Sequence, residues 1–189
     1  MRDVVRGANT GAEPVTVAEL KANGRIDGTT DDTLLAGFIT AARSEVEEFT
    51  RRMLIRGAVV YHIRGGDLPR FLDGVTLPWV PVIALTAVSY IQTSTGTTVS
   101  LSLSDFVLRA FDDAAFVVPA VGKAWPSDAS QLILAYTCGY AAADIPAPLK
   151  QSILWRASQF NANREGGVPI SDDAVTAALL GPWRVRQFG

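Results

Sequence analysis

Two stretches with the spacing of amphipathic helices lie far apart in this chain, and nearly everything between them has the composition of strands and turns. The first stretch, residues 31–53, is followed by the second at residues 146–164, whose early prolines suit a first helical turn. This order restricts the chain to a mixed fold in which a β segment separates two helices. Apolar side chains recur every three or four residues on one face of the first stretch, at Leu34, Leu35, Phe38, Ile39, Ala42, Val46, Phe49 and Met53.

We therefore predict an α+β protein, a helical bundle with an antiparallel β insert. The bundle contains the long helix 31–53, the helix 146–164 and short helices near both ends of the chain. The first short helix follows a capping box made by Thr16 and Glu19, and Gly24 is expected to close it in the left-handed conformation.

The β insert is predicted at residues 57–143, where charged side chains become sparse. Short runs rich in Val, Ile, Leu, Thr, Tyr and Phe alternate there with turn residues. Residues 132–136 are apolar without alternation, so this strand is expected to be covered on both faces. The predicted strands are 58–63, 71–77, 82–91, 105–108, 115–118 and 132–137.

The remaining segments divide the chain further. Residues 1–14 are small and polar, which predicts a flexible N-terminal arm. A helical body is predicted from residues 15–56 and 144–181. After the breaker Gly181-Pro182, residues 182–189 form a C-terminal tail.

Composition excludes several classes of function. With 17 basic and 19 acidic residues the net charge is −2, which lacks the strong positive field of a sequence-specific DNA-binding protein. The single histidine, His62, and the single cysteine, Cys138, cannot form a Cys/His zinc site within one subunit. The apolar run 79–91 is too short to span a membrane, and residues 1–10 lack the core of a signal peptide. We expect a cytosolic product without a membrane partner.

No catalytic constellation is evident, and we predict no enzyme, no cofactor and no metal site. His62 lies in a predicted strand without a nucleophile elbow, and Cys138 ends the most apolar strand. Asp112-Asp113 fits a turn and Asp172-Asp173 fits a helix cap. An enzyme would need a carboxylate mechanism at Asp112-Asp113, which is the weakest of the hypotheses.

Two features leave a binding function open. Trp79, Tyr90, Trp125 and Tyr136 lie in the β insert, where they either form core pairs or present a platform to a sugar. A carbohydrate- or ligand-binding β module on a helical base is therefore our alternative.

The second feature is the C-terminal tail, which combines aromatic and arginine side chains, the preferred anchors of protein interfaces. It either packs back on its own subunit or contacts a partner. The candidate interface residues are Trp183, Arg184, Arg186 and Phe188.

The order and spacing of several short motifs resemble one known family. The chain resembles the head–tail connector, or head-completion adaptor, family of tailed bacteriophages and gene transfer agents. The motifs that carry this resemblance span most of the chain: Val15 to Lys21, Asp31 to Leu35, Ala41 to Arg43, Leu77 to Val82, Val88 to Tyr90, Trp125-Pro126, Leu132 to Tyr140 and Ile145 to Ile153.

The resemblance implies a non-enzymatic subunit of a virion or virus-like particle, assembled in the bacterial cytoplasm. Such subunits form a homo-oligomeric ring, typically of twelve copies, under the portal protein. The ring extends the channel through which DNA passes without sequence-specific binding, and the stopper or tail proteins dock on it. By this resemblance the helical body forms the ring, and the C-terminal tail is the candidate contact with the portal.

Overall fold

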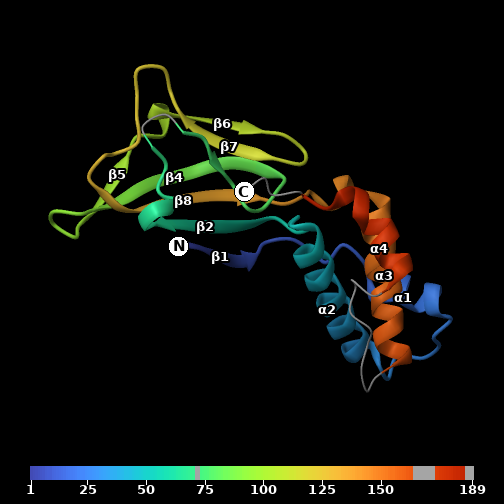
Figure 1. The fold of residues 1–189 in the computed structure, drawn as a ribbon. Coiled ribbons are helices and arrows are strands. Elements are labelled where there is room, and N and C mark those ends of the chain that lie inside the picture. The colour runs from blue at the N-terminus through green and yellow to red at the C-terminus, as the bar shows by residue number, and fades with distance from the viewer. Residues whose placement is uncertain (71–72, 164–172, 186–189) are drawn as a thin grey trace. The chain divides into compact units, whose positions relative to one another are not determined.

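The computed structural model describes residues 1–70, 73–163 and 173–185, and it divides the chain into two compact units (Figure 1). The β unit consists chiefly of Met1–Thr10 and Arg56–Gly139. The helical unit consists of Gly11–Ile55 and Tyr140–Arg186. Helices and antiparallel sheets occur together in the chain, so the predicted α+β class is confirmed.

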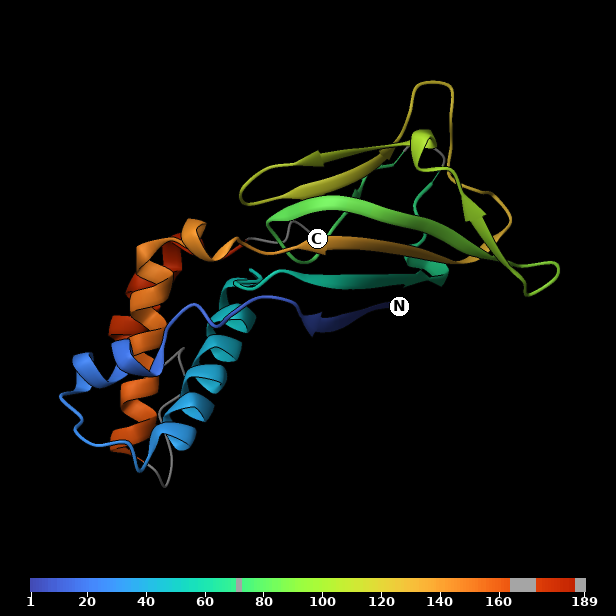
Figure 2. The same ribbon diagram turned by 180° about the vertical axis from the view of Figure 1, so that it is seen from behind.

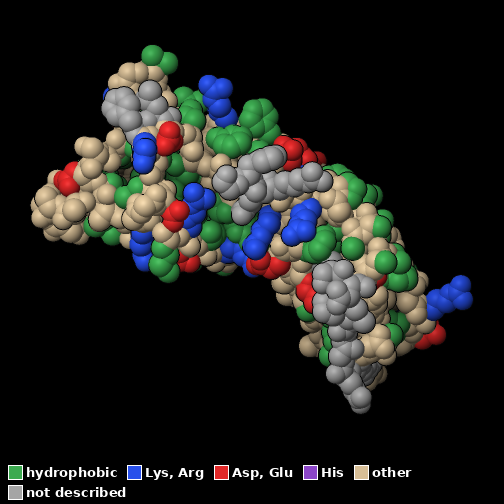
Figure 3. All heavy atoms as spheres, viewed as in Figure 1, with side chains coloured by type: hydrophobic (Ala, Val, Ile, Leu, Met, Phe, Trp, Pro, Cys, Tyr) green, Lys and Arg blue, Asp and Glu red, His purple; other side chains and the backbone are tan. Residues whose placement is uncertain are grey.

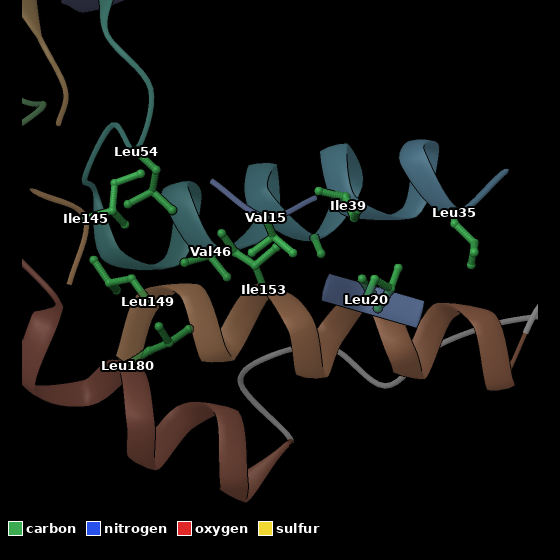
Figure 4. Close-up of a cluster of buried hydrophobic side chains, with 12 residues drawn as sticks. Val15, Leu20, Leu35, Ile39, Val46, Leu54, Ile145, Leu149, Ile153 and Leu180 are labelled. Atoms are coloured by element: carbon green, nitrogen blue, oxygen red, sulfur yellow. The ribbon is translucent and has the colours of Figure 1, made fainter. Parts of the chain in front are cut away.

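Among its described residues, the helical unit has four α-helices that share one apolar core (Figure 4). They are α1 (Val17–Gly24), α2 (Asp32–Thr50), α3 (Ala147–Ala162) and α4 (Ala174–Leu180). Side chains from all four helices meet, because each helix turns an apolar face inward. The fully buried members of this core include Leu20, Leu35, Ala42, Val46, Leu54, Leu149, Ile153, Ala157 and Leu180.

The helix ends only partly follow the prediction. The capping box of α1 is confirmed, because the Glu19 amide donates to the Thr16 hydroxyl and the Thr16 amide donates to the Glu19 carboxylate. These hydrogen bonds from Thr16 lower the pKa of Glu19. The left-handed residue that follows is Arg25, at φ 50°, and not Gly24 as predicted. Likewise α2 ends at Thr50, and Arg51 takes the left-handed conformation after it.

The β unit has two layers, which Figures 1 and 2 show from opposite sides. The larger layer is a five-stranded antiparallel sheet with the order β1-β2-β8-β4-β5, and the smaller is a three-stranded sheet with the order β3-β7-β6. Short 3-10 turns lie at Gly65–Asp67 and Leu103–Asp105 in this unit, and others lie at Ala142–Asp144 and Gly181–Trp183 in the helical unit. The strands are β1 (Arg2–Asn9), β2 (Gly57–Arg64), β3 (Val75–Thr76), β4 (Val82–Gln92), β5 (Thr98–Leu101), β6 (Phe106–Ala110), β7 (Ala115–Pro119) and β8 (Ala129–Cys138).

The core of the β unit lies between its two layers, so the central strands β2 and β8 of the larger sheet bury one face, whereas the outer strands β1 and β5 have no buried residue. On β8, Leu134 and Tyr136 are fully buried, whereas Ile133 and Ala135 on the opposite face are only half-buried. The prediction that β8 is covered on both faces is therefore wrong for the single chain. The reason is the layer count: among the described residues of the β unit, the three-stranded sheet covers one face and no element covers the other.

The predicted N-terminal arm is wrong as well, because most of it forms β1. Its residues pair with β2 in an antiparallel register that runs from Arg2 opposite Ile63 to Asn9 opposite Gly57. A strand held by backbone hydrogen bonds to a neighbour does not require apolar side chains of its own, and this is why composition missed it. The Arg6 guanidinium also lies 4.5 Å from the centre of the Trp79 ring. The structure adds β5, and of the predicted strand 71–77 it forms only β3, residues 71 and 72 lying outside the described part.

Candidate assembly surfaces

The end of α2 is fixed by a buried charge cluster in the helical unit. The Arg43 guanidinium donates to Glu13 at 2.8 Å and to Glu47 at 2.9 Å, and the other Glu47 oxygen accepts from the Leu54 amide at 2.8 Å. The side chains of Arg43 and Glu47 are 7% and 2% exposed. This cluster binds the chain before α1 and the chain after α2 to the same helix.

A second cluster links α2 to α3 through an arginine that the sequence did not single out. Arg156 is buried, and its guanidinium donates to Glu45 at 2.9 and 2.6 Å and to Gln159 at 2.6 Å. The spacing signal is visible in retrospect, since Arg156 lies one turn from Ser152 and three residues from Ile153 on the buried face of α3. A buried guanidinium without its carboxylate partner would be costly, so this contact favours the arrangement in which α3 lies beside α2.

Asp173 caps α4, as predicted for the Asp172-Asp173 pair, while Asp172 lies outside the described residues. The Asp173 carboxylate accepts hydrogen bonds from the Val175 and Thr176 amides, the Thr176 hydroxyl, Gln159 and Trp155. Partial burial would raise the pKa of Asp173, but these hydrogen bonds outweigh it and lower the pKa to about 2. The Asp173 carboxylate therefore holds α3 and α4 together.

The described part of the C-terminal tail packs on the helical unit. The Arg52 guanidinium donates to the Trp183 carbonyl oxygen at 2.7 Å and lies 5.6 Å from the centre of its indole ring. The Val185 amide donates to the Thr50 carbonyl oxygen at 2.9 Å, and the Arg184 guanidinium lies 5.3 Å from the Phe49 ring centre. Trp183 and Arg184 are therefore placed together beside the end of α2. The other two candidates, Arg186 and Phe188, lie outside the described residues.

The residues considered for catalysis have structural surroundings. His62 Nδ1 lies 2.7 Å from the Gln131 amide nitrogen on the sheet, and Cys138 is fully buried. Asp112-Asp113 lies in the turn between β6 and β7. Among residues 1–70, 73–163 and 173–185, no group of three or more His, Cys, Asp or Glu side chains is arranged to hold a metal ion. Within the same ranges, no helix is long and apolar enough to cross a bilayer.

Three of the four aromatic side chains proposed for sugar binding, Trp79, Trp125 and Tyr136, belong to the core, and Tyr90 on β4 is half-buried. Trp79 and Trp125 are 4% and 5% exposed, and Tyr136 is fully buried, so burial raises the pKa of its phenol. The Trp125 ring stacks on Phe106 with centres 4.7 Å apart, and its indole nitrogen donates to the Asp73 carbonyl oxygen at 2.7 Å. A sugar platform needs exposed aromatic rings, and none of these four side chains is exposed.

The surface charges are mixed. On the face shown in Figure 3, acidic and basic side chains lie among one another on both units. Exposed apolar side chains stand out instead, with Val107 43% and Phe111 58% exposed on or beside β6. Exposed apolar groups that cluster are typical of surfaces that contact other proteins.

Comparison with known proteins places these features in a family context. Residues 14–100 match the family model of the phage gp6-like head-tail connector protein. No curated protein matches the sequence.

The whole chain also resembles solved chains of gene transfer agent (GTA) particles. A chain from the neck of an empty GTA particle, computed with C6 symmetry, superposes with a TM-score of 0.79 at 21% identity, covering 100% of this chain and 97% of that one. A chain from the virion of a native GTA particle gives 0.72 at 23% identity, with 96% of each chain covered. A chain from the neck of a native GTA particle, computed with C12 symmetry, gives 0.68 at 20% identity, covering 98% and 97%. The sequence match over residues 14–100 confirms the resemblance to the phage head–tail connector family, and the solved GTA chains show a fold shared over nearly the whole chain.

Proposed function

We propose that this protein is a structural head–tail connector subunit, one copy of a homo-oligomeric ring in the neck of a phage or phage-like particle. The observation that carries the proposal is the family match over residues 14–100 together with the fold shared with GTA neck chains. The neck structures with C6 and C12 symmetry favour a ring, and we propose twelve copies. The particle is a virion or virus-like particle assembled in the bacterial cytoplasm.

The surroundings of the polar groups agree with a subunit that runs no reaction. Contacts between elements occupy the buried ionised side chains of Arg43, Glu47 and Arg156. The Asp173 carboxylate forms the cap of α4. The carbohydrate-binding alternative loses its support, because the rings of Trp79 and Trp125 are buried.

The ring would extend the DNA channel beneath the portal. A net charge of −2 suits a conduit, because a strongly basic bore would bind phosphates and slow the passing DNA. In this proposal the helical unit, as a helical bundle, forms the ring body, the β unit forms a side lobe, and stopper or tail proteins dock on the assembled ring.

The tail beyond the helix breaker is the proposed portal contact, with Trp183, Arg184, Arg186 and Phe188 as its anchors. Arg184 is exposed although its guanidinium lies over Phe49, so it can reach a partner without unfolding the helical unit. Trp183 is held by Arg52 and would serve as the fixed base of the tail.

Mixing the purified chain with the portal protein of the same particle and sedimenting the mixture tests this function. We expect co-sedimentation with the full-length chain and weaker binding, by about tenfold, for Arg184→Glu, since arginine anchors often contribute more than about 1.4 kcal/mol. The control Arg25→Glu reverses the same charge at an exposed residue after α1 and should bind like the wild type. Absence of any complex with the full-length chain would overturn the connector function. Equal binding by Arg184→Glu would overturn only the role of the tail.

A further inference from the structure

The five-stranded sheet has an outer face, turned away from the three-stranded sheet, that is almost free of charge. Val5, Val60, Ala135 and Ala87 form one row of this face across β1, β2, β8 and β4. Val5 is 50% exposed and Ala87 is exposed, while the two central residues are half-buried by their neighbours. We call this surface the flat face. Its small and β-branched side chains give it little relief, which suits close packing by another surface.

The opposite side of the β unit has a different character. There the outer face of the three-stranded sheet carries Val107 beside Val118 and Arg109 beside Phe116, and Phe111 follows in the turn after β6. Val107 and Phe111 are among the most exposed large apolar side chains of the described residues. We call this surface the hairpin face. Figures 1 and 2 show the β6–β7 layer and the larger sheet as separate layers of the unit.

The two faces are unlike, and they lie on opposite sides of one two-layered unit. A two-fold contact would pair a surface with itself, whereas a cyclic ring needs two different surfaces that fit each other. Resting on the connector function proposed above, we propose that the flat face of each copy packs against the hairpin face of the next copy in the ring. The β unit then contributes a contact between copies in addition to the helical ring body.

The few charges on the two faces are compatible with a second copy of the chain as the partner. The charged side chains of the flat face are Asp3 on β1 and Arg64 on β2, both from strands at or next to the sheet edge, so its centre can be desolvated cheaply. The hairpin face combines the apolar side chains of Val107, Phe116 and Val118 with one charged strand residue, Arg109, which lies opposite Phe116 within the same face. A nucleic acid or an anionic membrane would require many more positive charges than either face has.

The size of the flat face explains why the contact would be weak in isolation. Strands of eight to eleven residues in β1, β2, β8 and β4, at about 4.8 Å spacing and about 3.3 Å per residue, give a face of roughly 600 Å². A stable pair of proteins buries about 800 Å² on each partner. The contact therefore supplements other contacts in a ring and does not form a strong dimer by itself.

Cysteine cross-linking with a flexible bismaleimide tests the proposal, using Ala87→Cys on the flat face and Val107→Cys on the hairpin face. Both positions are exposed, and native Cys138 is fully buried, so the wild type serves as the blank. The reaction is run at high protein concentration and again with the portal protein present. Mixing the two single variants should give dimers, each variant alone should give none, and the chain carrying both cysteines should give a ladder of oligomers.

The control pairs Ala87→Cys with Thr93→Cys, whose side chain is exposed beyond the end of β4 and belongs to neither face. This pair should not cross-link. Dimers from Ala87→Cys alone would show a two-fold contact and overturn the proposal, as would a mixture that fails to cross-link under both conditions. If that mixture fails while the chain still co-sediments with the portal, the connector function stands and only this interface is lost.

Discussion

At the scale of single residues, the helical unit depends on buried charges that are fully paired. Glu47 accepts from Arg43 and from the Leu54 amide, so removing it leaves a buried guanidinium with Glu13 alone and a buried amide without a partner. We expect Glu47→Ala to lower the free energy of unfolding by about 3 kcal/mol. Urea unfolding monitored by circular dichroism measures this change.

The adjacent residue provides a matched control for that substitution. Glu48 pairs with Arg51, the residue that follows α2, but both side chains are nearly half exposed. Glu48→Ala should therefore cost less than about 1 kcal/mol. Equal losses for the two variants would mean that burial does not set the contribution of these charges.

At the scale of secondary-structure elements, α4 depends on the cap that Asp173 supplies. Asp173→Ala removes hydrogen bonds to two backbone amides and to the Thr176, Gln159 and Trp155 side chains, and we expect it to cost about 1 to 2 kcal/mol at pH 7. Because the folded-state pKa is lowered to about 2, this stabilisation is fully present above the unfolded-state value near 3.9. It is lost as the pH falls from about 4 towards about 2.

The stability difference between wild type and Asp173→Ala, measured by urea unfolding at several pH values, checks this prediction. The difference should be constant from pH 7 to about 5 and should shrink below about 4. Asp173→Asn is the companion variant, because asparagine also caps helices but cannot titrate, so its own contribution should not change over this range. If the stability difference between wild type and Asp173→Ala is unchanged at pH 2, the predicted titration of Asp173 is contradicted.

The elements that the sequence predicted well are those whose signal is local. The long helix is visible from the spacing of Leu35, Ile39 and Val46, and the structure places it at Asp32–Thr50 within the predicted 31–53. The helix predicted at 146–164 lies at Ala147–Ala162 for the same reason. The helix ends were less predictable, because contacts distant in sequence, such as that between Arg52 and Trp183, help decide where the chain leaves the helix.

The elements that the sequence missed depend on a distant partner. β1 is polar and becomes a strand only because β2, which is distant in the sequence, offers it an edge. The aromatic and arginine residues of the candidate interface could be predicted from the sequence, but their position beside α2 could not. Nothing in the sequence indicates that the Val185 amide donates to the Thr50 carbonyl oxygen. The buried roles of Arg43, Glu47 and Arg156 were missed because charged residues are ordinarily assigned to the surface.

At the scale of the whole molecule, the larger segment of the β unit, Arg56–Gly139, is inserted in the sequence between the two segments of the helical unit, and this insert closes on itself. Gly57 at the start of β2 lies opposite Cys138 at the end of β8, so the insert returns the chain close to the point where it departed. Each unit also has its own buried core, one around Leu149 and the other around Leu134. The helical unit can therefore tolerate a long insert, because the β unit itself holds the two ends of that insert together.

Two fully buried leucines test whether the units open independently. Leu149→Ala in α3 and Leu134→Ala in β8 make the same chemical change, each expected to cost about 2 to 5 kcal/mol. Native-state hydrogen exchange should then show faster exchange of α2 and α3 amides in Leu149→Ala, with β2 and β8 amides little changed, and the reverse pattern in Leu134→Ala. Equal acceleration in both units for either variant would mean that the chain unfolds as one cooperative body. Independent opening would let a connector subunit adjust its β unit against a neighbouring copy while the helical unit stays folded.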